Sequence, residues 1–227
     1  MNTIHKTCII EGDVNLGEGN QILPNTILLG PTTIGNNNLI GPNVVIGSPG
    51  QDTRNPRYDS SNCRIEIGND NIIREFTAIQ KPCYRHVTRV GDRVFFMQSV
   101  HIPHDAIIQD DVVITPMCVL AGITTILRGA NLGMGVTVNQ NSVIGHFSFI
   151  AMGSALTKNI RPFSIYVPGK PSRPNLYALK KFGWEEFEDE VSKYVLEKCP
   201  PKSETIGSIV AEFEKLHQDS KRALYDQ

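Results

Sequence analysis

Residues 101–105 (HIPHD) combine two imidazoles with a carboxylate, and they are the part of the chain best suited to chemistry. An imidazole titrates near neutral pH and can act as a general base. Gly122 follows His104 by 18 residues, and Gln140 follows Gly122 by the same interval. A glycine N–H can face a ligand and stabilise an oxyanion. If an interval of 18 brings these positions together, the arrangement fits acyl transfer with His104 as the base.

A six-residue repeat supplies that interval. Aliphatic or aromatic residues occupy every sixth position in three runs of eight, three and twelve positions. A helix would repeat at three and four and an amphipathic strand at two, so a period of six indicates a solenoid with the anchors pointing into a shared interior. With three hexads per coil, residues 18 apart stack on one face, about 4.8 Å per coil. The anchors are Ile4, Ile10, Leu16, Ile22, Leu28, Ile34, Ile40 and Ile46, then Ile67, Ile73 and Ile79, then Val90, Phe96, Ile102, Ile108, Ile114, Leu120, Ile126, Leu132, Val138, Ile144, Ile150 and Leu156.

The repeat is interrupted twice and then ends. Residues 48–64 are polar and turn-rich, which indicates a loop ejected from one coil, and residues 80–89 form a second irregularity. We predict an all-β solenoid, a parallel β-helix over residues 1–168 with about seven or eight coils. Beyond a proline-rich connector, apolar residues at intervals of three and four predict a helical region over 169–227, with two short helices that cap the last coil.

Composition argues against several classes of function. The 227 residues carry a formal net charge of -1, so no basic surface for nucleic acid is expected. No apolar run approaches the ~20 residues of a membrane span, and no signal-peptide pattern precedes Ile4, so we predict no membrane span and a cytoplasmic location. The five cysteines lie far apart without a Cys-x-x-Cys pair, which favours reduced thiols over a zinc knuckle or a disulfide framework.

These features together resemble a known family. A hexad solenoid with Gly-Gln-Asp at 50–52, Ile-Arg-Glu-Phe at 73–76, the HIPHD segment and Leu-Ala-Gly at 120–122 is similar to the UDP-N-acetylglucosamine acyltransferase of lipid A synthesis and its sugar-nucleotide acyltransferase relatives. The resemblance implies a left-handed parallel β-helix and a homotrimer with active sites between neighbouring subunits. It also implies a nucleotide sugar and an acyl thioester as substrates, with no bound cofactor or metal ion.

The resemblance also assigns roles to residues. His104 matches the family's general base, Asp105 matches the aspartate that orients it, and the Gly122 amide matches the one that faces the thioester oxygen. The candidates for contact with the sugar nucleotide are Gln51, Asp52, Arg54, His101 and Gln140, of which Arg54 would meet phosphate and Gln140 could instead meet the donor. The candidates for contact with the donor are the positive residues Lys170, Arg173 and Lys181, which could bind phosphates, and Met152.

The chain departs from that family at several positions. Ile123 and Asn139 stand where the lipid A enzyme carries histidines, and residues 81–87 (KPCYRHV) lack its glycine run. An acidic string at 185–190 differs from the basic surface expected to dock an acyl carrier protein. We therefore expect transfer from acyl-CoA to a nucleotide-linked amino sugar, with 3-O-acylation of UDP-N-acetylglucosamine by acyl carrier protein as the alternative.

Met152 bears on the length of the acyl chain. It falls where long-chain lipid A enzymes have a glycine that leaves the acyl groove open, and a methionine side chain would fill such a gap. Each methylene in an apolar groove contributes ~0.8 kcal/mol, so we expect a short donor, from acetyl to roughly four carbons.

Two other classes stay open. A zinc enzyme of the carbonic-anhydrase type would use interfacial histidines, and His86, His101 and His104 are available. On a strand, however, His101 and His104 should point to opposite faces because they are three residues apart. A non-catalytic solenoid with a binding or ice-adsorbing surface would show threonine ladders at fixed hexad positions, whereas the threonines here are scattered.

Overall fold

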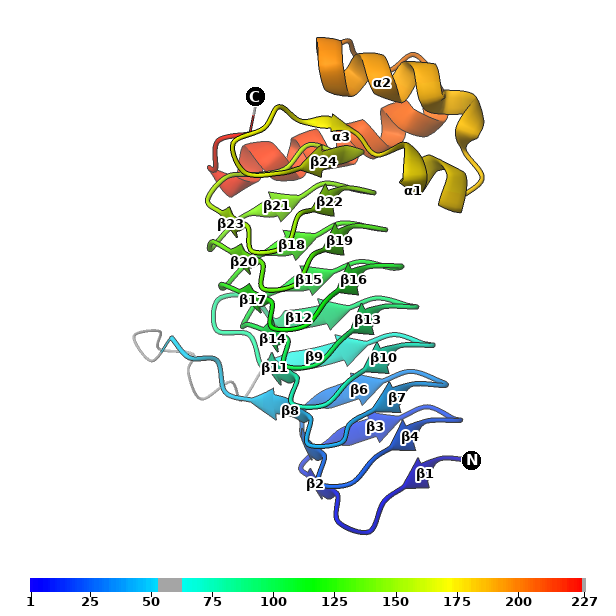
Figure 1. The fold of residues 1–227 in the computed structure, drawn as a ribbon. Helices are drawn as coiled ribbons and strands as arrows, with labels where there is room; N and C mark the ends of the chain where they lie inside the picture. Colours follow the sequence, from blue (N-terminus) through cyan, green and yellow to red (C-terminus); the bar gives the residue numbers. More distant parts are fainter. Residues whose placement is uncertain (53–62, 226–227) are drawn as a thin grey trace.

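The chain winds into a column of stacked coils with helices at one end (Figure 1). The computed structural model describes residues 1–52 and 63–225. Over this range the strands form three sheets, which are the three sides of a prism, and seven coils contribute one strand to each side. All pairs are parallel except the last, β24 with β25. The fold is the left-handed parallel β-helix that the sequence predicts.

Each sheet collects one strand from successive coils. Sheet 1 contains β1 (Thr3–Ile4), β4 (Gln21–Ile22), β7 (Leu39–Ile40), β10 (Ile72–Ile73), β13 (Phe95–Phe96), β16 (Val113–Ile114), β19 (Asn131–Leu132), β22 (Phe149–Ile150), β24 (Ser164–Tyr166) and β25 (Arg173–Pro174). Sheet 2 contains β2 (Ile9–Glu11), β5 (Ile27–Leu29), β8 (Val45–Ser48), β11 (Ala78–Gln80), β14 (His101–Ile102), β17 (Val119–Leu120), β20 (Thr137–Val138) and β23 (Ala155–Leu156). Sheet 3 contains β3 (Val14–Leu16), β6 (Thr32–Ile34), β9 (Arg64–Ile67), β12 (Val87–Val90), β15 (Ile107–Ile108), β18 (Thr125–Ile126) and β21 (Val143–Ile144).

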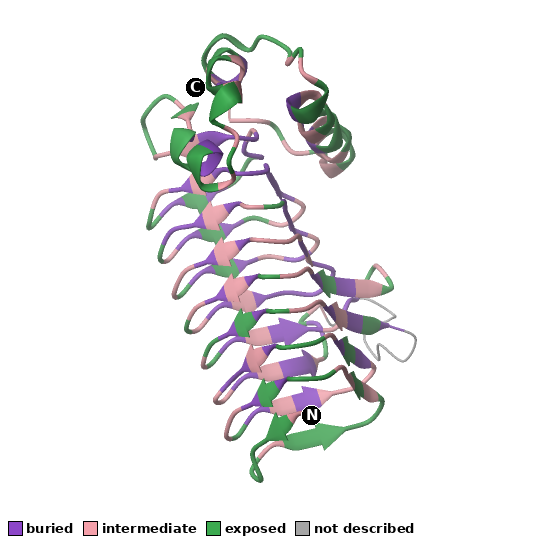
Figure 2. Cartoon of the chain, turned by 90° about the vertical axis from the view of Figure 1, so that its right-hand side faces the viewer, coloured by how far each residue is buried: buried purple, intermediate pink, exposed green. Residues whose placement is uncertain are grey.

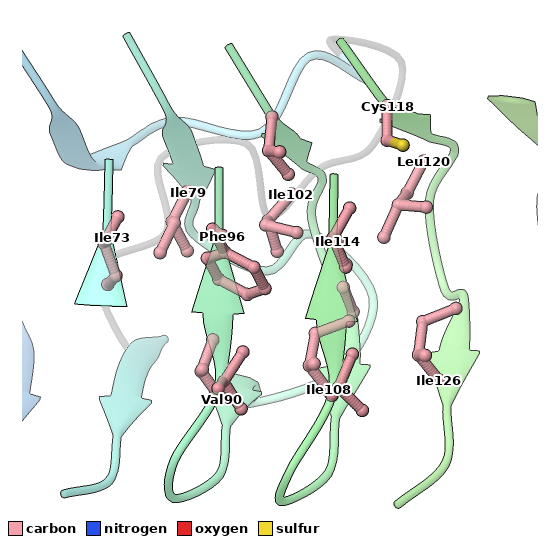
Figure 3. Packing of buried hydrophobic residues seen from close by; sticks show 14 of the residues in the cluster. Ile73, Ile79, Val90, Phe96, Ile102, Ile108, Ile114, Cys118, Leu120 and Ile126 are labelled. Carbon is pink, nitrogen blue, oxygen red and sulfur yellow. The ribbon is translucent and has the colours of Figure 1, made fainter. Parts of the chain in front are cut away.

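The hexad anchors form the interior of the column. Figure 3 shows Ile102, Ile114, Leu120 and their neighbours pointing inward from the three sheets, and these side chains are fully buried. Burying one such side chain stabilises the fold by about 1.5–3 kcal/mol, so the repeat itself accounts for the cohesion of the column. In the first coil the anchors Ile4 and Ile10 remain 42% and 40% exposed, because only one neighbouring coil covers them.

Both interruptions of the repeat leave the column at the same corner. Paired residues of regular coils are 18 apart, as Ile114 and Leu132 are. The separation grows to 33 between Ile40 and Ile73 and to 23 between Ile73 and Phe96. The extra residues follow β8 and β11, which are neighbours in sheet 2, so both insertions emerge where sheet 2 turns into sheet 3. The next corner in this column of turns follows β14 and contains residues 103–106.

The C-terminal region contains more helices than the two predicted. They are α1 (Leu176–Lys181), the 3-10 helix η1 (Glu185–Phe187), α2 (Glu188–Glu197) and α3 (Glu204–Ser220). A turn at Gly183, whose φ is +70°, divides the first predicted segment, because this left-handed conformation favours glycine and ends the helix. Figure 2 shows buried residues where these helices meet the column and exposed residues on their outer sides.

Extended segments as well as helices cover the last coil. β25 pairs antiparallel with β24, and the residues after α3 return to the column, where the N–H of Asn159 donates to the Ala223 carbonyl (2.8 Å). Across the part of the chain that is described, none of the helices is both long enough and apolar enough to cross a membrane.

Candidate functional site

A pocket of about 490 Å³ opens on sheet 2 beside the corner that follows β14. Its position follows from the fold, because the two insertions and the 103–106 turn occupy successive levels of the same corner. Its lining residues are Gln51, Gln80, His101, Pro103, His104, Val119, Leu120, Ala121 and Gly122. The sequence had singled out four of these, namely Gln51, His101, His104 and Gly122.

His104 and Asp105 form a buried, hydrogen-bonded pair at the edge of this pocket. Nδ1 of His104 lies 2.7 Å from Oδ2 of Asp105. The Asp105 backbone is left-handed, with φ of +63°, and its N–H donates to Oγ1 of Thr88 (3.0 Å). This turn conformation is open to aspartate, and it directs the carboxylate back towards the preceding histidine. Because a carboxylate only accepts, the Nδ1 nitrogen carries the proton and Nε2 is left as the acceptor.

Asp105 is held by the second insertion. The backbone N–H groups of Cys83, Tyr84 and Arg85 donate to its carboxylate, with donor–acceptor distances of 3.1 Å for Cys83 and 3.0 Å for Tyr84. Burial would raise the pKa of Asp105, but the hydrogen bonds from His104 and from these three backbone groups outweigh it and hold the pKa below its ordinary value. The carboxylate therefore stays charged while it orients the imidazole.

Gly122 lies directly against the His104 ring, one coil further along. A Cβ atom at Gly122 would be 2.2 Å from Cε1 and 2.4 Å from Nε2 of His104, so a larger residue would displace the imidazole. The amides on either side, Ala121 and Ile123, donate to carbonyls of adjacent coils (2.9 and 3.1 Å). The Gly122 N–H makes no hydrogen bond to another described residue, which leaves it available to an oxyanion.

The expected placement of His101 is wrong. Both His101 and His104 line the same pocket instead of facing opposite sides of the sheet. Strand alternation does not extend from one to the other, because β14 ends at Ile102 and the chain turns at His104 and Asp105. Burial lowers the pKa of His101, and the nearby His104, when protonated, lowers it further. His101 therefore favours the neutral form.

The other candidates for contact with the sugar nucleotide are only partly gathered here. Gln51 lines the pocket, and Asp52 follows it at the end of the described stretch. Arg54 lies outside the described residues. Gln140 lies one coil beyond Gly122 on the same corner but does not line the pocket, and its carbonyl accepts from Nε of Arg222 (2.8 Å).

The donor candidates lie further along the column. Met152 is 74% exposed in the corner before β23. This corner is at the opposite edge of sheet 2 from the corner that contains His104 and Gly122. Lys170, Arg173 and Lys181 are exposed beyond the last complete coil, and Nζ of Lys181 lies 5.2 Å from the centre of the Phe182 ring. None of these four residues lines the pocket.

Sequence reasoning missed Tyr84 and Gln80. Tyr84 lies with its ring centre 5.8 Å from that of His104, and its hydroxyl donates to Asp52. Gln80 lines the pocket from β11, where the register shifts, and its side-chain carbonyl is buried without a hydrogen-bond partner among the described residues. The only signal in the sequence was the break in the hexads at 80–89, which marks an insertion but not what it touches.

Within a single chain, the three histidines of the zinc alternative are not all brought together. Within residues 1–52 and 63–225, no three histidine, cysteine, aspartate or glutamate side chains are arranged so that they could hold a metal ion. His86, which that alternative would use, is exposed and does not line the pocket.

The chain is similar to proteins of one family. The family model described as "Bacterial transferase hexapeptide (six repeats)" matches residues 13–48. A Synechocystis protein named acyl-[acyl-carrier-protein]--UDP-N-acetylglucosamine O-acyltransferase is 35% identical over 77% of this chain and 57% of its own length. A Syntrophobacter fumaroxidans protein of the same name is 37% identical over 77% of this chain and 67% of its own length. The chain therefore spans about three fifths of the length of these two relatives.

Solved structures share the fold. A UDP-N-acetylglucosamine acyltransferase from Campylobacter jejuni superposes with a TM-score of 0.83 at 22% identity, over 99% of this chain and 100% of that one. One from Bacteroides fragilis superposes with a TM-score of 0.77 at 24% identity, over 99% and 98%. These superpositions include the helical end of the chain as well as the column.

Proposed function

Because this chain belongs to the family of the acyl-carrier-protein-dependent UDP-N-acetylglucosamine O-acyltransferases, we propose that it transfers an acyl group from acyl carrier protein to a hydroxyl group of UDP-N-acetylglucosamine. The observation that carries the proposal is the buried His104–Asp105 pair with Gly122 packed against the imidazole. This is the alternative that the sequence had left beside acyl-CoA and an amino sugar, and the names of the relatives favour it. The reaction would belong to lipid A synthesis, as the resemblance implies.

The chemistry follows from the hydrogen bonding of His104. Asp105 keeps the proton on Nδ1, so Nε2 accepts the proton of the sugar hydroxyl as its oxygen attacks the thioester carbonyl. The C–O bond forms while the carbonyl oxygen becomes an oxyanion, which the Gly122 N–H stabilises. When the intermediate collapses, the C–S bond breaks and the thiolate takes the proton from His104. Asp105 stabilises the imidazolium between these two steps.

The acceptor would be bound at the side of the pocket that Gln51 and His101 line. Gln51 and Asp52 would contact the saccharide, and neutral His101 would donate or accept one hydrogen bond to it. We assign Arg54 to a phosphate group of the nucleotide and Gln140 to the sugar or the donor, both on the resemblance alone. Gln80 is a further candidate because its amide lines the same pocket.

The donor would approach from the helical end of the column. Lys170, Arg173 and Lys181 are exposed there and would meet phosphate groups of the donor. Between that end and Gly122, the outward residues of sheet 2 are Val119, Thr137 and Ala155, which stack in register. These small side chains leave a shallow face for an acyl chain. Met152 stands at the far edge of this face, which supports a short acyl group.

We infer a homotrimer with the pocket at the contact between subunits. Three methionines at successive levels of the corner between sheets 1 and 2, Met117, Met134 and Met152, are exposed in the single chain. An exposed apolar column of this kind is typical of a surface that another subunit covers. Light scattering should give three times the chain mass of 25.1 kDa. Met134→Glu should reduce that mass, because it would place a charge in the contact.

A second candidate reaction is N-acylation of a nucleotide-linked amino sugar by acyl-CoA. It is favoured by Ile123 and Asn139, which replace two histidines of the lipid A enzyme. Ile123 is a β-branched residue with φ of +65°, an unusual conformation directly after Gly122, so this corner differs physically from one that carries a histidine.

A substrate panel separates the two candidates. Purified protein is incubated with UDP-N-acetylglucosamine or UDP-linked amino sugars, each with short and long acyl groups on acyl carrier protein and on coenzyme A, and products are read by mass spectrometry. O-acylation that depends on acyl carrier protein supports the proposal, and N-acylation from acyl-CoA supports the second candidate. His86→Ala serves as the control for His104→Ala, because His86 is exposed and away from the pocket. The absence of any transfer would contradict both.

A further inference from the structure

Tyr84 contacts two parts of the site that are far apart in sequence, the His104–Asp105 pair and Asp52. Its backbone N–H donates to the Asp105 carboxylate (3.0 Å), and its ring centre lies 5.8 Å from that of His104. Its hydroxyl donates to Oδ2 of Asp52 (2.5 Å). Tyr84 thus connects the catalytic pair to the loop that begins after β8.

The two insertions are closely packed where this connection is made. A Cβ atom at Gly50 would lie 2.3 Å from Sγ of Cys83 and 2.8 Å from Cβ of His104, so the start of the first loop lies directly against the second insertion and the base. This packing brings Asp52 within reach of the Tyr84 hydroxyl. The side chain of Tyr84 remains 44% exposed, so burial of its ring is not the main consequence of its position.

We infer that Tyr84 is a positioning residue for the acceptor, because its hydroxyl aims the Asp52 carboxylate at the site where the sugar binds. The inference rests on the proposed function and extends it to a residue for which the resemblance provides no counterpart, since the related enzymes have a glycine run in this segment. A carboxylate that is already oriented loses less conformational freedom when it binds a sugar, so the acceptor binds more tightly. The backbone and the ring of Tyr84 would act separately, through Asp105 and His104.

These contacts can be separated by substitution. Tyr84→Phe removes the hydroxyl but keeps the backbone hydrogen bond and the ring, so it should raise KM for UDP-N-acetylglucosamine about tenfold with kcat within about twofold. Tyr84→Ala also removes the ring beside His104 and should lower kcat as well. Tyr177→Phe, on α1 and 76% exposed, is the matched control and should match the wild type.

A double-mutant cycle tests whether the effect runs through Asp52. Asp52→Ala should raise KM at least as much as Tyr84→Phe, and adding Tyr84→Phe to Asp52→Ala should have no further effect, because the carboxylate it aims is gone. Additive effects of the two substitutions, or an unchanged KM in Tyr84→Phe, would overturn the inference. Tyr84→Phe should also leave the pH dependence of kcat unchanged. If the Tyr84 hydroxyl acted through Asp105, the same substitution would shift that pH dependence.

Calorimetric titration with UDP-N-acetylglucosamine keeps this test separate from that of the proposed function. If the wild type binds this probe about tenfold more tightly than Tyr84→Phe but transfers no acyl group to it, the inference holds and the proposed function fails. If transfer depends on His104 while Tyr84→Phe keeps the wild-type KM and affinity, the proposed function holds and the inference fails. A wild type that neither binds nor acylates the probe would overturn both.

Discussion

Asp105→Asn should both destabilise the protein and remove its base. The carboxylate accepts from His104 and Cys83 on Oδ2, from Arg85 on Oδ1 and from Tyr84 on both. An amide offers only one oxygen. If that oxygen takes the Oδ1 position, it keeps the Tyr84 and Arg85 bonds, while the NH₂ group faces the Cys83 N–H and His104. The opposite orientation would place the NH₂ group against the Arg85 N–H, which makes the shortest of these bonds (2.5 Å). His104 can change tautomer to accept from an NH₂ group and a backbone N–H cannot, so the first orientation is favoured.

The expected losses in the free energy of unfolding and in kcat follow from that orientation. One buried backbone donor, the Cys83 N–H, is left without an acceptor, which costs about 1–3 kcal/mol. The loss of charge-assisted hydrogen bonds adds to this, so we expect the free energy of unfolding to fall by about 2–4 kcal/mol at pH 7. The asparagine NH₂ would also donate to Nδ1 of His104 and shift the proton to Nε2. His104 could then not accept the proton of the hydroxyl, and kcat should fall by about 10²–10⁴-fold.

The pH dependence provides a second measurement. The pKa of Asp105 is lower in the folded protein than in the unfolded chain, so its stabilising contribution is complete above the unfolded value of about 3.9 and is lost as the pH falls through the folded value. The difference in thermal stability between wild type and Asp105→Asn should therefore be largest at neutral pH and should narrow below about pH 4. Asp189→Asn, at an exposed helical carboxylate, is the control. A kcat within twofold of the wild type, or a stability difference that does not change with pH, would refute this account of Asp105.

Four further substitutions test the rest of the site and the fold. His104→Ala should lower kcat by about 10²-fold or more while circular dichroism stays unchanged, and unchanged turnover would remove His104 from the mechanism. Ile114→Asp should yield unfolded or insoluble protein, since an unpaired carboxylate in the interior of the column costs several kcal/mol. An unchanged melting temperature would contradict the assignment of the hexad anchors to the interior. Met152→Gly should shift donor preference towards longer acyl chains in a competition assay, at ~0.8 kcal/mol per added methylene. Ile123→Asn should raise the free energy of unfolding by about 1 kcal/mol, because asparagine tolerates the left-handed conformation at φ of +65° better than isoleucine, and a lower stability would show that the side chain's packing outweighs the strain.

The sequence by itself determined the architecture of this protein. A side chain such as Ile114 recurs every sixth position, and only a coil of three short strands places all of these positions inside. The same repeat predicted that His104 and Gly122 lie together, because positions 18 apart occupy equivalent places in adjacent coils. A regular repeat makes long-range contacts readable from local spacing.

The tertiary structure decided what the irregular segments do. The two insertions have no period of their own, so their sequence did not reveal that residues 83–85 donate three N–H groups to Asp105. The placement of His104 on the same side as His101 was likewise set by the turn at residues 104–105 and not by strand alternation. The contact of Tyr84 with Asp52 depends on two loops meeting in space, and such a contact is fixed only by the three-dimensional path of the chain.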